Sequence, residues 1–568
     1  MAKIPSDLEI AQSAELKPIV EIARELGILE EELEPYGKYM AKISLDILDR
    51  LKDRPSGKFI TVTAITPTPF GEGKTVTNLG VGLGMARLGK KVINTLREPS
   101  KGPTFGIKGG ACGGGYAQVL PMENINLHFT GDIHATESAH NLCAAAIDAS
   151  ILHKNPLNID PLSITWTRAV DVNDRALRNI VIGLGGKANG YPREAGYDIT
   201  AATETAAIHA LAVSIKDLRE RLGRVVVGFT YDGKPVTAED LKVAGAMTVL
   251  MKDSLKPNLV QSTENTPVIV HGFPFANVAH GNNSVLADMI ALKLADYVVT
   301  ESGFGSDCGF EKLVNVKCRQ SGLKVDCAVI VATIRALKMH GGAFTIKPGQ
   351  KLDPEVAGKV DMEALERGCE NLRRHIEIVK MHGVPAVVAI NRFTTDTDEE
   401  IEFVRKKAVE FGAEDAVPHE AWAKGGAGAT DLAKAVIAAC EKGSDFHFLY
   451  PDDLSIKEKI ETLATKIYGA SSVSYEPLAE KKIKLYTELG YDKLPINMAK
   501  THLSLSHDPN WKGAPSGYTF PIRDIRASVG AGFLYPIAGK MQTMPGLPTK
   551  AAFQAVDIDE TGKTVGLF

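Results

Sequence analysis

Residues 58–75, KFITVTAITPTPFGEGKT, constrain the fold of this chain more than any other stretch. The apolar, β-branched run Phe59–Ile65 predicts a buried strand, a Pro/Gly loop follows it, and the next residues, TVTNLGVGLGMARLG, have a helical pattern. A strand, a glycine loop ending in Lys-Thr and a helix form the layout of a phosphate-binding P-loop. We therefore predict that nucleotide binds to the loop residues Thr68, Pro69, Phe70, Gly71, Glu72, Gly73, Lys74 and Thr75.

The residue types in this loop suit a nucleoside triphosphate. Backbone N–H groups of the loop and of the helix N-terminus would face the phosphates. Lys74 would reach the β- and γ-phosphates, and the Thr75 hydroxyl would hold Mg²⁺. The motif departs from the consensus at Thr68, where a glycine is usual, so an ordinary helix start remains the alternative interpretation.

Composition sets the class of protein. A chain of 568 residues is long enough for roughly three or four domains. Its 44% apolar and 24% charged residues are typical of soluble globular proteins, and a net charge of −4 with scattered basic residues does not suggest a nucleic-acid binder. We see no signal peptide and no apolar window of about 18 residues, so we expect a cytoplasmic protein without a membrane span. Seven cysteines without a Cys-x-x-Cys pair indicate free, buried thiols.

Strand-like runs alternate with helical patterns over the first two thirds of the chain, which predicts an α/β fold: a P-loop NTPase-like parallel sheet core with additional α/β domains. The runs are Phe59–Ile65, Val92–Leu96, Arg224–Thr230, Pro267–His271, Tyr297–Thr300, Asp326–Thr333 and Pro385–Ile390. We expect a discontinuous nucleotide-binding domain (1–105 and 241–370), a second α/β domain (106–240) and a C-terminal domain (371–568). Prolines accumulate after Asp452, so we expect that tail to be partly irregular.

Polar and aromatic residues follow several of these runs, where ligands bind in parallel sheets. Arg97 and Glu98 come directly after Val92–Leu96. A guanidinium beside the P-loop suits bidentate binding of a carboxylate or phosphate, whereas a surface ion pair with Glu98 or another acid is the alternative. The segment that follows Tyr297–Thr300 is ESGFGSDCG, and the segment that follows Pro385–Ile390 is NRFTTD.

Residues 125–132, INLHFTGD, alternate apolar and polar side chains and predict a strand that carries Asp132 at its tip. In a P-loop protein such an acid can hold Mg²⁺ through water, and capping of the next helix is the alternative. The nearby His128, His134 and His140 are spaced by six residues, which fits neither a helix face nor a strand face, so we expect no zinc site.

Two aromatic residues are candidates for stacking a flat ligand. Phe393 follows a predicted strand, and Trp422 lies in the glycine-flanked segment HEAWAKGGAGATDLA. Ordinary core packing is the alternative for Trp422. The glycine run 109–115, GGACGGG, is either a flexible loop or a place where the backbone closely approaches a ligand.

Long segments across the chain resemble the formate–tetrahydrofolate ligases, also called 10-formyltetrahydrofolate synthetases. The matching segments are TPTPFGEGKT, LREPSKGPTFGIKGGACGGGYAQ, NLHFTGDIHA, NDRALRNIVIGLGGKANGYPRE, TYDGKPVTAEDL and WAKGGAGA. The similarity runs from IPSDLEIAQ to the final GLF, and no dehydrogenase/cyclohydrolase region precedes it. The resemblance therefore implies the monofunctional prokaryotic form.

The resemblance implies a function in one-carbon metabolism. ATP, formate and tetrahydrofolate would give 10-formyltetrahydrofolate, ADP and phosphate through a formyl phosphate intermediate. Lys74 and Arg97 would hold that intermediate, and Phe393 and Trp422 of the C-terminal domain would sandwich the pterin. Phe304 would lie near the reacting groups, and Glu98 near an activating K⁺ or NH₄⁺. The family is typically a homotetramer.

Some residues depart from the family pattern. Thr394 stands where proline is common after the stacking Phe393, and Asn497 stands where cysteine is common. Two other functions stay open: a P-loop ligase or kinase acting on another small carboxylate, and an ATP-switched regulatory protein, against which Pro69 argues because a second lysine is expected there. Polyglutamate preference, the preferred ion and the direction of flux are not encoded in these patterns.

Overall fold

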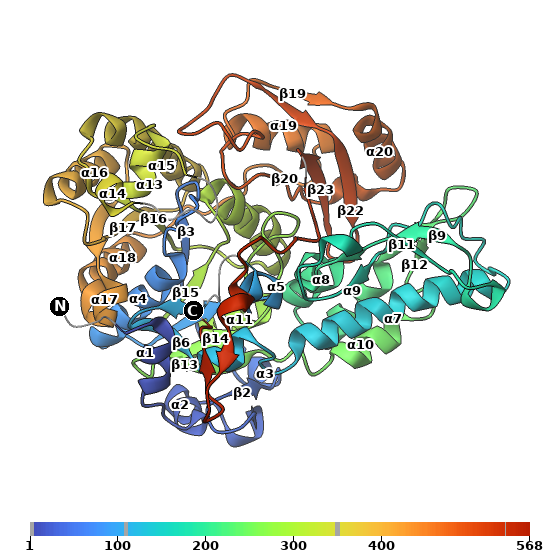
Figure 1. The fold of residues 1–568 in the computed structure, drawn as a ribbon, viewed down its shortest axis with the longest axis horizontal. Coiled ribbons are helices and arrows are strands. Elements are labelled where there is room, and N and C mark those ends of the chain that lie inside the picture. Colours follow the sequence, from blue (N-terminus) through green and yellow to red (C-terminus); the bar gives the residue numbers. More distant parts are fainter. Residues whose placement is uncertain (1–4, 107–111, 347–352, 540, 568) are drawn as a thin grey trace.

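A computed structural model describes residues 5–106, 112–346, 353–539 and 541–567 (Figure 1). Its centre is a large sheet in a mixed α/β fold, as predicted. The main path across this sheet is β1 (Leu33–Pro35), β2 (Ala41–Ile43), β13 (Asn258–Ser262), β14 (Pro267–Val270), β4 (Val92–Leu96), β15 (Tyr297–Glu301), β3 (Lys58–Ala64), β16 (Cys327–Ala332), β17 (Ala386–Asn391) and β18 (Asp415–His419). The pair β5 (Gly113–Gly114) and β6 (Ala117–Leu120) joins it at β13.

From β14 to β18 along this path, each strand is parallel to the next. Their carboxyl ends therefore meet at one edge of the sheet, where α/β proteins bind ligands. The predicted run Arg224–Thr230 is an exception. It forms β11 (Val226–Phe229), which pairs with β12 (Pro235–Thr237) in a separate antiparallel pair.

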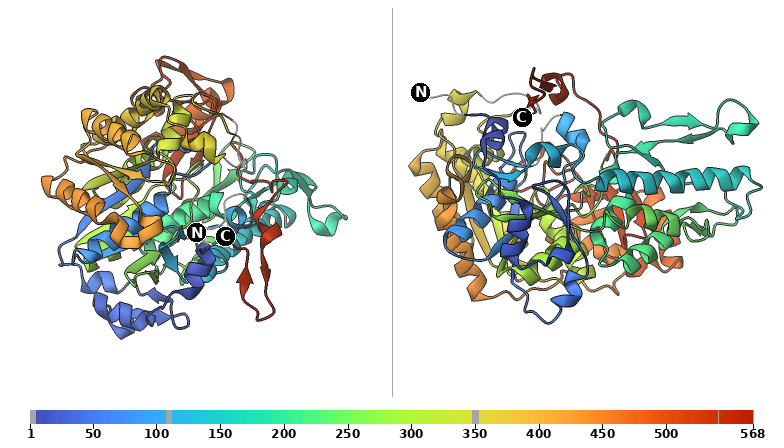
Figure 2. Two further views of the ribbon diagram at one scale, coloured as in Figure 1. Left: turned by 60° about the vertical axis from the view of Figure 1, so that its left-hand side comes forward. Right: turned by 90° about the horizontal axis from the view of Figure 1, so that it is seen from below.

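Helices cover both faces of the sheet (Figures 1 and 2), which explains why its strands are almost continuously apolar. In β3, Ile60 and Val62 pack in a cluster with α4 (Lys74–Arg87) and α18 (Thr430–Lys442), whereas Phe59 belongs to the cluster on the opposite face. Helices that contribute to this second cluster include α2 (Ile19–Leu26), α3 (Ile47–Arg50), α11 (Val285–Leu294), α13 (Ile334–His340), α15 (Met362–Lys380) and α16 (Asp398–Glu410).

Shorter helices connect these elements. They are α1 (Asp7–Ser13), α5 (Lys101–Phe105), α6 (Met122–Asn126), α12 (Arg319–Ser321), α14 (Pro354–Gly358) and α17 (Ala421–Lys424). The first of them begins with the capping box of Ser6 and Glu9.

A second lobe extends to the side of the sheet (Figure 2, right). It has its own apolar core around α7 (Asp132–Leu152), α8 (Glu204–Leu211), α9 (Ile215–Arg224) and α10 (Ala244–Met251). Its short strands are β7 (Arg168–Ala169), β8 (Ile180–Ile182), β9 (Arg193–Ala195), β10 (Tyr197–Asp198), β11 and β12.

The C-terminal region is partly irregular, as predicted, since residues 501–518 form neither helix nor strand. It contains α19 (Ile456–Lys466), α20 (Pro477–Glu488), the pair β19 (Ser472–Tyr475) and β21 (Thr519–Ile522), and the three strands β20 (Ala499–Lys500), β22 (Asp524–Ser528) and β23 (Phe533–Ala538). A small hairpin, β24 (Asp557–Ile558) and β25 (Thr564–Val565), follows. Because β17 and β18 lie beyond residue 370, the central sheet continues into the range that we assigned to the C-terminal domain; the domain boundaries stay a prediction.

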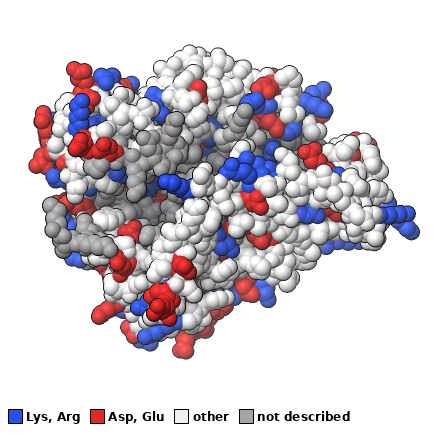
Figure 3. Space-filling model, in the orientation of Figure 1, with Lys and Arg blue, Asp and Glu red and all other residues white. Residues whose placement is uncertain are grey.

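All seven cysteines are buried and unpaired, as predicted. Acidic and basic side chains are interspersed over much of the face in Figure 3, in keeping with the small net charge. Within the described ranges, every helix is too short or too polar to cross a lipid bilayer.

Candidate active site

The predicted P-loop lies between β3 and α4, and its two glycines adopt left-handed backbone conformations. Gly71 has φ 72° and Gly73, the N-cap of α4, has φ 80°. A side chain at Gly73 would also meet the Asn391 amide, because its Cβ would lie 2.4 Å from Asn391 Nδ2. Glycine is thus required there for two independent reasons.

The loop is held in place by its own side chains. The buried Glu72 carboxylate accepts hydrogen bonds from the Thr68 backbone N–H and from the Thr68 hydroxyl, both at 2.8 Å. Asn391 Nδ2 donates to the Glu72 carbonyl oxygen at 3.0 Å. These bonds explain why threonine replaces the consensus glycine at position 68, and they fix the loop before any ligand arrives.

A carboxylate that we did not predict lies beside the start of α4. Glu301 is the last residue of β15, and its Oε2 accepts a hydrogen bond from the Thr75 hydroxyl at 2.9 Å. Its Oε1 is 3.9 Å from Arg97 Nε. The sequence signal for Glu301 was its position at the exit of the run Tyr297–Thr300, but one acid among many polar residues was not distinctive.

Arg97 follows β4, the strand next to β15, and faces the same edge as the loop. Its Nη1 donates to the Pro274 carbonyl oxygen at 3.4 Å, whereas its buried Nε has no hydrogen-bond partner in the described part of the chain. The alternative that we gave was an ion pair with Glu98 or another acid, and the structure shows such a contact with Glu301, whose Oε1 lies 3.9 Å from Arg97 Nε. Lys74, the first residue of α4, is partly buried at the same edge.

The Glu98 side chain is 4% exposed, and its Oε2 lacks a hydrogen-bond partner among the residues described. Burial raises the pKa of this carboxyl well above its ordinary value, and the nearby negative charge of Asp132 raises it further. A carboxylate oxygen that is buried without a donor fits a bound cation.

The strand predicted at residues 125–132 is wrong. Residues 122–126 form α6, and α7 begins at Asp132 directly after Gly131. Phe129 lies beyond the end of α6 with a left-handed backbone, φ 45°, so the residues that we expected in one strand divide between a short helix and a turn.

Asp132 is fully buried, and each of its two carboxylate oxygens contacts a protein group. Its Oδ1 is 2.7 Å from the Nζ of the buried Lys42, and its Oδ2 accepts a hydrogen bond of 2.7 Å from Asn258 Nδ2. Each oxygen thus has a protein partner, and the water-mediated contact with Mg²⁺ stays a prediction.

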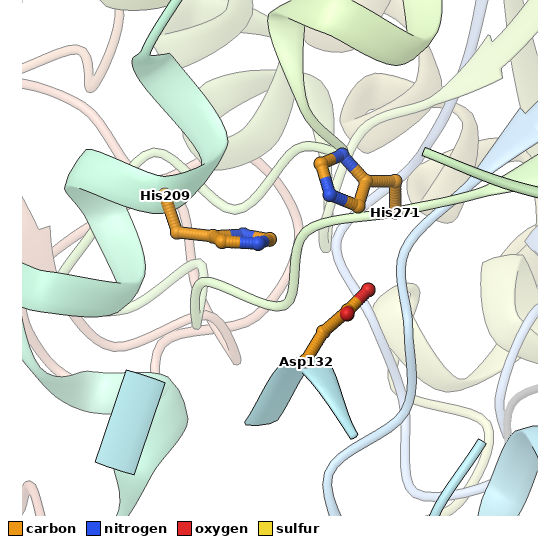
Figure 4. A group of neighbouring side chains, drawn as sticks. All are labelled: Asp132, His209 and His271. Carbon is orange, nitrogen blue, oxygen red and sulfur yellow. The ribbon is translucent and has the colours of Figure 1, made fainter. Parts of the chain in front are cut away.

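Asp132, His209 and His271 converge from α7, from α8 and from the segment after β14 (Figure 4). One potential metal-ligand atom from each lies within 4.8 Å of the others. Both histidine Nε2 atoms, however, are 2.8 Å from the Ser254 carbonyl oxygen, and burial lowers the pKa of both rings. With Asp132 occupied and both Nε2 protons donated, this group is a network of hydrogen bonds, and we assign no metal to it.

Phe304 follows β15 and has a left-handed backbone, φ 61°. Its ring stacks on His502, with the centroids 4.1 Å apart and the planes at 14°. The preceding Gly303 lies close to Arg97, because a Cβ there would be 3.5 Å from Arg97 Nη1. Phe304 thus belongs to the same edge of the sheet as Arg97.

Phe393 and Trp422 follow the adjacent strands β17 and β18, whose ends pair at Asn391 and His419. Trp422 is 39% exposed, which contradicts the alternative of core packing. The Phe393 backbone N–H donates to Asp396 Oδ2 at 2.8 Å. Across the described ranges, no ring contact joins the two aromatic side chains.

The glycine run approaches Trp422 closely. Residues 109–111 lie outside the described residues, but a Cβ on Gly114 would be 3.1 Å from Trp422 Nε1, and one on Gly115 would be 2.0 Å from the Trp422 carbonyl oxygen. Tyr116 N–H donates to that oxygen at 2.8 Å. The described part of the glycine run therefore packs against Trp422, and its approach to a ligand stays a prediction.

The whole chain is similar in sequence to known proteins of one family. A family model described as formate–tetrahydrofolate ligase matches residues 5–568. A formate–tetrahydrofolate ligase of Desulforamulus reducens is 65% identical over 568 residues and covers 100% of both chains. Proteins of the same name from Roseiflexus castenholzii and Saccharopolyspora erythraea are 57% and 53% identical, each covering 99% of this chain and 100% of the relative.

Proposed function

Because this chain belongs to the formate–tetrahydrofolate ligase family, we propose that the edge of the sheet described above is its active site. The chain catalyses the ATP-dependent ligation of formate to tetrahydrofolate, a C–N bond-forming reaction that uses Mg²⁺. The observation that supports this placement is the convergence of the P-loop, Arg97, Glu301, Phe393 and Trp422 at the carboxyl ends of neighbouring parallel strands.

We propose a formyl phosphate intermediate, because formate is a resonance-stabilised anion and a poor electrophile. A formate oxygen attacks the γ-phosphorus of ATP, and the bond from that phosphorus to the ADP oxygen breaks. The N10 amine of tetrahydrofolate then attacks the formyl carbon, phosphate leaves with the electrons of the bond between that carbon and the phosphate oxygen, and the N10 proton is released. Lys74 and Arg97 offset the repulsion between the two anions and hold the formyl phosphate.

The loop residues 68–75 hold the nucleotide in this proposal. The Thr75 hydroxyl and the Glu301 carboxylate are the oxygens that would hold Mg²⁺, which neutralises phosphate charge when bound. Asp132 contacts Lys42 and Asn258, and its predicted catalytic role stays a prediction. Phe304 borders the reacting groups beside Arg97.

We further propose that Glu98 contacts the activating monovalent cation, K⁺ or NH₄⁺. The supporting observation is its buried Oε2, which finds no donor in the described ranges. Glu98→Gln removes the charge but keeps the shape, so its activity should no longer rise when K⁺ replaces a bulky organic cation. An unchanged K⁺ activation would place the cation elsewhere.

The aromatic pair is expected to bind the pterin. Phe393→Ala and Trp422→Ala should each raise the KM for tetrahydrofolate several-fold, because a ring stacked on a flat ligand contributes about 1 kcal/mol beyond area burial. The KM for ATP should change little, since Lys74 and its loop bind the phosphates. Steady-state kinetics with each substrate varied in turn measures both KM values.

Stability measurements provide the control for this prediction. Since Trp422 is 39% exposed, the free energy of unfolding should fall by less than the ~3–5 kcal/mol typical of emptying a buried aromatic site. If Trp422→Ala unfolds the protein while the folded fraction keeps its tetrahydrofolate affinity, the indole is structural and the sandwich is wrong.

We also propose a homotetramer in the cytoplasm, on the grounds of the family resemblance and of the free thiols.

Mixing ATP, formate and tetrahydrofolate, and omitting one at a time, separates the ligase function from the alternatives. ADP formation that needs neither formate nor folate would favour an ATP-switched protein. ADP formation that needs a carboxylate other than formate would favour a different ligase or kinase.

A further inference from the structure

Arg335 contacts both halves of the site but has no part in the chemistry above. It is the second residue of α13, which begins after β16, the strand between β3 and β17. Its guanidinium carbon lies 3.7 Å from the centroid of the Phe393 ring and 5.3 Å from that of the loop residue Phe70. No pattern in the sequence drew attention to it.

Arg335 contacts the loop on one side and Phe393 on the other, and these two contacts differ in strength. On the loop side, its Nη2 donates only a long bond of 3.3 Å to the Gly71 carbonyl oxygen, and the loop has three other bonds through Glu72. On the folate side, Phe393 has its backbone bond to Asp396, and the guanidinium covers its ring. Loss of the Arg335 side chain should therefore disturb Phe393 far more than the loop.

The electrostatic surroundings also keep the guanidinium in this place. Burial lowers the pKa of Arg335, and the negative charges of Glu72 and Asp396 partly offset that effect. The cation is thus held between the carboxylate that closes the P-loop and the carboxylate that closes the Phe393 turn. Its buried Nε has no hydrogen-bond partner in the part of the chain that the structure describes.

We propose that Arg335 is a positioning residue for the folate substrate: by stacking on one face of Phe393, it fixes the plane in which that ring meets the pterin. A planar guanidinium stacks on an aromatic face and polarises it, whereas a lysine ammonium is a point charge without a plane. This inference rests on the proposed binding of the pterin to Phe393. This role would explain why position 335 is an arginine, which neither phosphate binding nor core packing explains.

The test compares Arg335→Met and Arg335→Lys with the wild type in steady-state kinetics. Arg335→Met should raise the KM for tetrahydrofolate about three- to tenfold and leave the KM values for ATP and formate within about twofold. Arg335→Lys should resemble Arg335→Met, because the stack needs the plane. Arg392→Met is the matched control: Arg392 neighbours Phe393 in sequence but pairs with the exposed Asp398, so it should behave as wild type.

A double-mutant cycle shows whether Arg335 acts through Phe393. In a Phe393→Ala background, Arg335→Met should have no further effect on the KM for tetrahydrofolate. An unchanged KM in the single Arg335→Met variant, an equal rise in the KM for ATP, wild-type behaviour of Arg335→Lys or additive effects in the cycle would each overturn the inference. If Phe393→Ala itself leaves the KM for tetrahydrofolate unchanged, the assignment of the pterin site fails instead.

Discussion

Lys74→Met should reduce kcat by about a hundredfold to a thousandfold. One preorganised contact at a charge that develops in the transition state contributes roughly 3–4 kcal/mol, and Lys74 occupies the first position of α4, where the helix N-terminus and the loop converge. The affinity for ATP should also fall, because the same ammonium contacts the phosphates in the ground state. Formate-dependent ADP release measures both effects.

Lys90→Met is the matched control for this variant. Lys90 is exposed and follows the other end of α4, so its replacement changes the net charge equally without touching the site. A Lys74→Met enzyme that keeps more than about a tenth of the wild-type kcat would exclude the role assigned to this lysine.

Arg97→Lys should lower kcat/KM for formate by about tenfold to a hundredfold, although it conserves the charge. Hydrogen bonds to charged groups each contribute about 1.5–3 kcal/mol, and a lysine cannot reproduce the fork of a guanidinium. The loss should be concentrated in formate-dependent steps, because ATP binding depends on the loop and on Lys74. Arg87→Lys serves as the control, since Arg87 forms an ion pair with Glu264 in which its side chain is 49% exposed.

Normal formate kinetics in Arg97→Lys would place Arg97 outside the active site. The structure gives a specific reason to expect otherwise. Arg97 Nε is buried without a hydrogen-bond partner in the described residues, and the nearest carboxylate oxygen, from Glu301, is 3.9 Å away. Burying an N–H donor without a hydrogen-bond partner costs free energy, unless a bound ligand accepts that hydrogen bond.

The strands that carry the site were predictable because both their faces are buried. Runs such as Val92–Leu96 match β4 to the residue, since apolar, β-branched segments of this length fit few other structures. The positions of Arg97 and Phe393 followed from those strands. The strand predicted at residues 125–132 failed because α6 ends at Asn126 and the chain then turns, with Phe129 in a left-handed conformation, before α7 begins.

The residues that the sequence did not reveal act through contacts between distant segments. Glu301 becomes distinctive only when β15 pairs with both β3 and β4, and thereby reaches Thr75 and Arg97. Asn391 closes the P-loop from β17, 319 residues further along the chain than Glu72. Such pairings depend on strand order, which local patterns do not specify.

The most direct test of the proposed chemistry follows the oxygen atoms of formate. The wild-type enzyme is supplied with formate labelled with ¹⁸O at both positions, unlabelled ATP and tetrahydrofolate, and the products are examined by mass spectrometry. If formyl phosphate forms, one ¹⁸O atom must appear in each released phosphate, and the other must remain in the formyl group of 10-formyltetrahydrofolate. Unlabelled phosphate would mean that ATP is hydrolysed separately, and it would contradict the activation of formate at Lys74 and Arg97.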